Sequence, residues 1–108
     1  MRVLFDNGVP RGVAAALRGH RVEEARDHGW DRLTNGALLD AAEAAGFDVF
    51  ITTDRNLRHQ QNLAGRTMAV VALSKTSWPL IRNHLSTIAS AVAAAAPGSF
   101  TEVDVRAT

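Results

Sequence analysis

The sequence contains no cysteine, which excludes disulfide bonds, thiolate zinc sites and a cysteine nucleophile. It has no apolar run near the ~20 residues that a membrane-spanning helix needs. Its first six residues lack the length and the cleavage site of a signal peptide. None of its four histidines forms a His-x3-His pair, so a histidine zinc site is not expected. We therefore expect a cytoplasmic protein in which any metal ion is held by carboxylates, histidines or amides.

Acidic residues are also missing from residues 55–101, although that stretch holds four arginines and one lysine. Residues 1–54, by contrast, hold six arginines and nine acids, while the net charge of the whole chain is only +1. The acid-free stretch has two interpretations. It forms a surface for an anionic partner, or it consists largely of apolar core that needs no acids.

The 108 residues are 46% hydrophobic and 21% charged, which is typical of one globular domain spanning residues 1–108. Apolar runs bounded by turn residues predict strands over residues 2–5, 47–52 and 67–73. Residues 20–24 predict a weaker strand near an edge, and the alternation over 100–105 predicts a half-exposed edge strand. Helical spacing and capping residues predict helices over residues 10–19, from 34 or 35 to 46, over 57–63, and from 79 to 96. Alternating strands and helices predict a three-layer α/β/α domain with a mostly parallel sheet of four to five strands.

Two acids follow two of the predicted strands directly. Right-handed crossovers and a central first strand give the strand order 2-1-3-4, in which strands one and three are neighbours. Asp6 follows strand one and Asp54 follows strand three. Their carboxyl ends then flank a point where the chain winds in opposite directions, the usual site crevice of an open α/β sheet. We expect these two carboxylates to share a divalent cation, Mg²⁺ or Mn²⁺, because hard oxygen ligands favour those ions.

Polar and basic residues near these acids are candidates for substrate binding. Asn35 is expected at the start of the second helix, near Asp6, where it caps the helix or joins the site. Residues 55–62 are polar or basic apart from one leucine, and this group closes with Arg66. Arginines and amides of this kind hold phosphates and base edges. The candidate substrate-binding residues are Asn7, Asn35, Arg55, Asn56, Arg58, Gln61 and Arg66.

Three segments resemble a known family when they are taken in order. Residues 3–10, Val-Leu-Phe-Asp-Asn-Gly-Val-Pro, resemble the first strand and acidic turn of PIN-like proteins. Residues 35–43 resemble the segment before the last core strand of PIN domains, which usually carries an Asp. Residues 50–57 resemble the family's Thr-x-Asp-x-x-Leu/Phe signature. The resemblance covers about residues 1–66 and is closest to short PIN-like proteins related to VapC-type toxins.

This resemblance implies a metal-dependent ribonuclease, often the toxin of a toxin–antitoxin pair. Asp6 corresponds to the first family acid and Asp54 to the last, so both are expected to be catalytic and to hold Mg²⁺ or Mn²⁺. Asn35 stands where a middle acid is usual, and for the helix glutamate of the family the candidates, by position only, are Glu24, Asp31 and Asp40. RNA and an antitoxin are the implied partners, and a homodimer is left open. Neither DNA as a direct partner nor a membrane is expected.

Two other functions stay open from the sequence. The first is a catalytically weakened PIN-like module that binds RNA or a protein without cleavage, which the amide at Asn35 favours. The second is a receiver-like phosphoacceptor domain, since Asp54, Ser74 and Lys75 follow strands three and four. Receivers have two adjacent acids after strand one, whereas here Asp6 is followed by Asn7. The ribonuclease is therefore the leading hypothesis.

Overall fold

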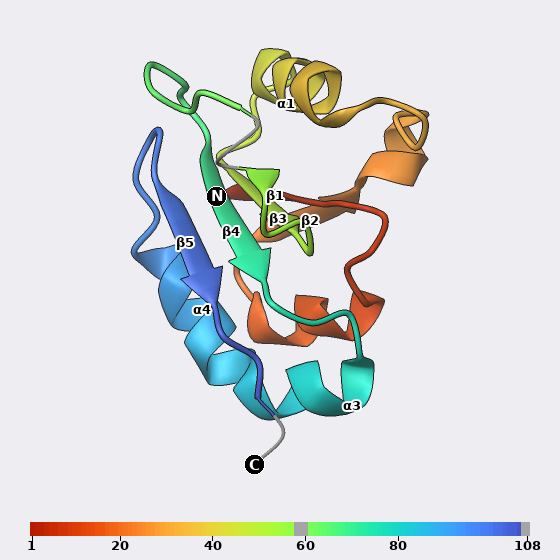
Figure 1. Ribbon diagram of the computed structural model, residues 1–108, viewed down its shortest axis with the longest axis vertical. Coiled ribbons are helices and arrows are strands. Elements are labelled where there is room, and N and C mark those ends of the chain that lie inside the picture. Colours follow the sequence, from red (N-terminus) through yellow and green to blue (C-terminus); the bar gives the residue numbers. More distant parts are fainter. Residues whose placement is uncertain (58–60, 107–108) are drawn as a thin grey trace.

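Five parallel strands form one sheet in the computed structural model, which describes residues 1–57 and 61–106 except the side chain of Asn35. The strands lie in the order β2-β1-β3-β4-β5, which confirms the predicted order of the first four (Figure 1). Their bounds are β1 (Arg2–Phe5), β2 (Arg21–Glu24), β3 (Val49–Thr52), β4 (Ala69–Leu73) and β5 (Phe100–Val103). Strand β1 spans its predicted range in full. Each of the other strands is a shorter segment within its predicted range.

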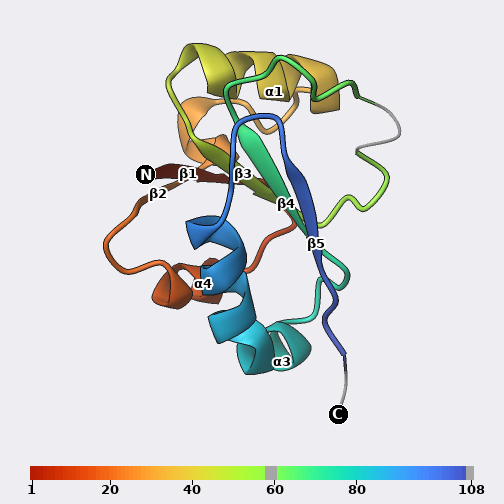
Figure 2. The same ribbon diagram turned by 90° about the vertical axis from the view of Figure 1, so that its left-hand side faces the viewer.

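Helices cover both faces of this sheet, so the predicted α/β/α layering is confirmed (Figures 1 and 2). One face carries α1 (Asn35–Ala44) and the 3-10 helix η2 (Ala25–His28). The other carries the 3-10 helices η1 (Arg11–Ala16) and η3 (Arg82–His84), together with α3 (Trp78–Ile81) and α4 (Leu85–Ala93). In the described part of the chain, no helix is long and apolar enough to cross a membrane.

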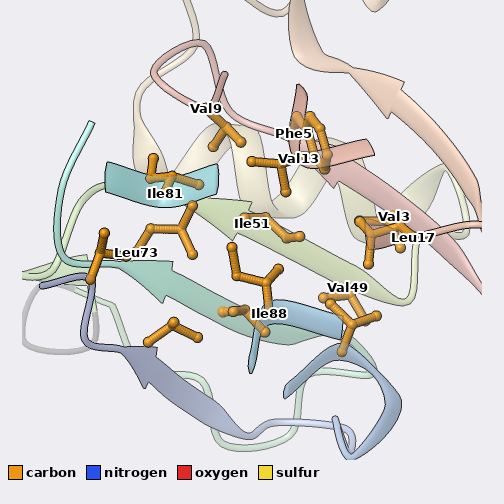
Figure 3. Packing of buried hydrophobic residues seen from close by; sticks show 14 of the residues in the cluster. Val3, Phe5, Val9, Val13, Leu17, Val49, Ile51, Leu73, Ile81 and Ile88 are labelled. Carbon is orange, nitrogen blue, oxygen red and sulfur yellow. The ribbon is translucent and has the colours of Figure 1, made fainter. Parts of the chain in front are cut away.

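The alternation of side chains along each strand divides the core in two. Val3, Phe5 and Ile51 point toward η1, α3 and α4 (Figure 3). Leu4 and Phe50, at the positions between them, point toward α1 and η2. Strands β3 and β4 are buried along their whole length, as parallel strands covered on both faces must be. The sequence therefore has continuous apolar runs because the residues of each central strand pack alternately into the core on one face of the sheet and the core on the other.

Two predicted helices differ from the observed elements. Residues 10–19 do not form the predicted α-helix. The 3-10 helix η1 occupies part of this segment instead. The predicted long helix from residue 79 is divided into α3, η3 and α4. Asn83 Nδ2 donates a hydrogen bond to the carbonyl oxygen of Pro79 (3.3 Å), and His84 Nε2 lies 3.0 Å from the carbonyl oxygen of Arg106. The Asn83 side chain thus bonds to the carbonyl four residues before it, where it competes with the backbone hydrogen bond of a continuous helix. The predicted helix over residues 57–63 includes residues outside the described part of the chain.

Candidate functional site

Asp6 and Asp54 lie at the same edge of the sheet, beyond the carboxyl ends of two neighbouring strands. Asp6 directly follows β1, and its backbone N–H donates to the carbonyl oxygen of Ile51 in β3 (2.9 Å). Asp54 is the second residue after β3. The chain continues from β1 to β2 on one side and from β3 to β4 on the other. The edge between β1 and β3 is therefore the topological switch point that the sequence predicts.

A buried hydroxyl group joins these two acidic turns. The side chain of Thr52 is fully buried at the end of β3. Its Oγ1 donates a hydrogen bond to Asp6 Oδ2 (2.9 Å) and accepts one from the backbone N–H of Asp54 (3.0 Å). The Asp6 carboxylate and the Asp54 backbone are thus held by one side chain. Sequence reasoning did not select Thr52 as a site residue, although a hydroxyl that ends an apolar strand two residues before an acid is a visible signal.

The turn after β1 is fixed by further hydrogen bonds. The backbone N–H of Asn7 donates to Asp6 Oδ1 (2.9 Å), so both carboxylate oxygens of Asp6 accept a hydrogen bond. Asn7 Nδ2 donates to the carbonyl oxygen of Asp31 (3.2 Å), which ties the turn to the loop before α1. At Gly8, an added Cβ would lie 2.6 Å from Thr53 Oγ1, so the turn after β1 packs closely against the Thr53 side chain in the turn after β3.

Helix α1 begins beside this edge, with Thr34 at the N-cap position and Asn35 as the first helical residue. The side chain of Asn35 lies outside the described part, so its predicted role stays a prediction. The side chain of Gln61 lies over the first turn of α1, where a Cβ added at Gly36 would be 3.1 Å from Gln61 Oε1. Gln61 therefore lies against the start of α1, and its predicted role in substrate binding stays a prediction.

The two residues after Asp54 have different roles. The backbone N–H of Asn56 donates to Asp54 Oδ1 (3.0 Å), which orients that carboxylate within its own turn. The guanidinium of Arg55 instead pairs with Glu102 on β5, at 3.1 Å from both Nε and NH2 to Oε1. Arg55 thus turns away from the β1–β3 edge toward the far side of the sheet.

Arg66 is not brought to this site. It precedes β4 and therefore lies at the opposite, amino-terminal edge of the sheet. Its guanidinium pairs with Asp40 (2.9 Å) and Glu43 (3.2 Å) on α1, and its side chain is only 15% exposed. Arg58, the third arginine of the predicted basic group, lies outside the described residues. Arg55 and Arg66, the two described arginines of this group, therefore both pair with acids that lie outside residues 55–101.

The donor set at this edge fits a magnesium or manganese ion that keeps several of its own waters. Asp6 and Asp54 supply carboxylate oxygens, and a carboxylate oxygen has two lone-pair directions, of which each oxygen of Asp6 uses one for the hydrogen bonds described above. Magnesium is commonly bound through one or two carboxylates together with waters and substrate phosphate. No group of three or more His, Cys, Asp or Glu side chains comes together within residues 1–57 and 61–106. These residues therefore fit a partly hydrated ion rather than one enclosed by protein.

In comparisons with models of protein families, with curated proteins and with solved structures, no match to this chain was found.

Proposed function

We propose that this chain is a metal-dependent ribonuclease of the PIN-like type, acting as the toxin of a toxin–antitoxin pair. One observation carries the proposal of a metal-dependent site. The strand order places the turns after β1 and β3 side by side, and the Thr52 hydroxyl contacts both of them. The choice of RNA as substrate, the toxin role and the antitoxin partner rest on the resemblance of three segments in residues 1–66.

In this proposal, Asp6 and Asp54 hold Mg²⁺ or Mn²⁺ through their carboxylates. The ion, when bound, activates a water molecule and stabilises negative charge on the phosphate. The chain's own contribution is orientation. Asn7 and Thr52 fix the two oxygens of the Asp6 carboxylate, and the N–H of Asn56 fixes one oxygen of Asp54. Because hydrogen bonds from backbone N–H groups and from the Thr52 hydroxyl orient both acids, little reorganisation is needed when an ion binds.

A second candidate is a PIN-like module that binds RNA or a protein without cleaving it. The small number of acids favours this alternative, since Asn35 replaces a usual acid and no third carboxylate joins Asp6 and Asp54 in the described part of the chain. Fewer negative charges hold a divalent ion less tightly. The two candidates differ in one measurable property, which is metal-dependent hydrolysis of RNA.

The test compares RNA cleavage by the purified chain in Mn²⁺, in Mg²⁺ and in EDTA, on a labelled single-stranded RNA of mixed sequence. We expect cleavage only with metal, and a loss of about 100-fold or more in Asp6→Asn and in Asp54→Asn, the order expected when a group stabilising transition-state charge is removed. Asp40→Asn is the matched control, because Asp40 is an exposed acid of α1 that pairs with Arg66 at the other edge.

Cleavage that continues in EDTA would contradict the proposal. So would Asp6→Asn and Asp54→Asn variants that are as active as Asp40→Asn. If the chain binds RNA and never cleaves it under any metal condition, the non-catalytic module is the correct function.

A further inference from the structure

We propose that Arg11 and Arg26, which share the carboxylate of Glu24, bind the phosphodiester backbone of single-stranded RNA next to the Asp6 edge. The inference rests on the proposed function and deepens it. It moves the substrate's path from residues 55–66, where the sequence placed it, to the opposite side of the acidic edge, across β2.

The position of Glu24 in the sheet supports this path. Glu24 is the last residue of β2 and is paired in register with Phe5, which directly precedes Asp6. Neighbouring strands lie about 4.8 Å apart. Glu24 is therefore one strand away from the Asp6 turn, at the same carboxyl-terminal edge. Figure 2 shows β1 and β2 side by side.

Two arginines from different layers converge on this carboxylate. Arg11 begins η1 on one face of the sheet, and its Nε lies 3.0 Å from Glu24 Oε2. Arg26 belongs to η2 on the other face, and its Nε lies 3.7 Å from Glu24 Oε1. The Glu24 side chain is only 17% exposed, so a half-buried carboxylate on a strand orients both cations.

Two guanidinium groups face one carboxylate, so the cluster of Arg11, Glu24 and Arg26 has a net charge of +1. The side chains of Arg11 and Arg26 are 73% and 49% exposed. The closest approach to Glu24 is made by the Nε atom of each arginine, and each guanidinium also carries two terminal nitrogens. Two terminal nitrogens of an arginine match two oxygens of one phosphate.

The arginines near the other candidate residues differ in this respect. Arg55 has one acidic partner and Arg66 has two, so neither offers a surplus of positive charge. A phosphodiester chain carries one negative charge per nucleotide. One phosphate can therefore lie at the metal-binding edge while a neighbouring phosphate lies on Arg11 and Arg26.

The test measures RNA binding in EDTA, so that binding is observed without cleavage. A fluorescent oligouridylate of about ten nucleotides covers a typical single-strand site. Its affinity is measured by anisotropy from about 50 to 200 mM salt. We expect Arg11→Ala/Arg26→Ala to bind more weakly and to reduce the slope of log affinity against log salt by about 1.4, since each single-strand phosphate contact contributes about 0.7.

Arg18→Ala/Arg21→Ala is the matched control, with the same charge change at the amino-terminal end of β2. It should keep the wild-type slope. Because the double variant leaves Glu24 without its cations, a triple variant that adds Glu24→Gln is measured in parallel, and thermal melting verifies that each variant is folded. We expect the triple variant to bind as weakly as the double variant.

Three results would overturn the inference: equal losses in the two double variants, an unchanged slope in Arg11→Ala/Arg26→Ala, or no RNA binding by the wild type. Displacement of the RNA by polyglutamate at equal charge would also overturn it, because the arginines would then bind an acidic polypeptide.

If the wild type cleaves RNA while the arginine variants bind normally, this inference alone fails. If the arginines matter and no cleavage occurs, the ribonuclease proposal alone fails.

Discussion

At the scale of single residues, the hydroxyl of Thr52 links the ends of β1 and β3. It donates to the carboxylate of Asp6 and accepts from the backbone N–H of Asp54, and it does so without contact with solvent. A buried N–H or carboxylate that loses its partner costs more free energy than the hydrogen bond itself contributes. Thr52 therefore matters for stability as well as for the geometry of the site.

We expect Thr52→Val to lower the free energy of unfolding by about 1–3 kcal/mol, because the valine has the same shape but lacks the buried hydroxyl that bonds to the Asp6 carboxylate and to the Asp54 backbone. Thr52→Ser is the matched control. It keeps the hydroxyl and removes one methyl group, and should cost about 1 kcal/mol, in the range of other buried methyl deletions. Urea denaturation of the three proteins measures both values. A valine variant as stable as the wild type would show that the hydroxyl does not hold the two turns together.

At the scale of elements, Glu43 fastens α1 to the segment that leads into β4. It accepts hydrogen bonds from the backbone N–H and the hydroxyl of Thr67, and it pairs with Arg66. The hydrogen bonds from Thr67, together with the positive charge of Arg66, hold the pKa of Glu43 below its ordinary value of 4.5. The Arg66 that sequence analysis assigned to RNA binding therefore has a structural role at this contact.

This pKa shift predicts how stability depends on pH. Because the pKa is lowered in the folded state, ionised Glu43 stabilises that state above pH 4.5, and the stabilisation is lost as the pH falls toward the lowered value. Glu43→Gln should therefore be less stable than the wild type at neutral pH. The difference between them should shrink as the pH is lowered below 4.5. Urea denaturation across this pH range measures it, and a difference that does not change with pH would contradict the assignment.

At the scale of the whole molecule, the sheet has a protected centre and two edges. Strands β3 and β4 are fully buried in the middle, whereas β2 lies at one edge and its residues are half-buried or exposed. Local opening needs little energy where few apolar contacts are lost. The candidate site is thus attached to the buried centre of the sheet through β1 and β3, while Glu24 lies on the edge strand β2.

Native-state hydrogen exchange should show this gradient. We expect the amides of β3 and β4 to exchange only through global unfolding, and the amides of β2 to exchange through local opening at a lower free energy. NMR exchange rates measured at increasing denaturant separate the two regimes. Equal protection of β2 and β4 would contradict the expectation and would mean that η1 and η2 hold the edge strand as firmly as the core holds the centre.

The sequence alone was sufficient for the sheet and for the position of its two acids. Short apolar runs between turn residues gave the strands, and the handedness of crossovers placed β1 beside β3. Because the carboxyl ends of neighbouring parallel strands share one edge, Asp6 and Asp54 had to lie at the same edge. These inferences need only local periodicity and chain topology.

Only the tertiary structure decided which side chains meet. Thr52 bonds to Asp6 across 46 residues of sequence, and Arg55 bonds to Glu102 across 47. Periodicity indicates which face a residue occupies, but it does not identify the partner that reaches that face from another element. For the same reason the sequence did not show that Arg55 and Arg66 pair with acids from β5 and α1. The convergence of Arg11 and Arg26 on Glu24 depends on two connections that cover opposite faces of the sheet, and only folding brings them together.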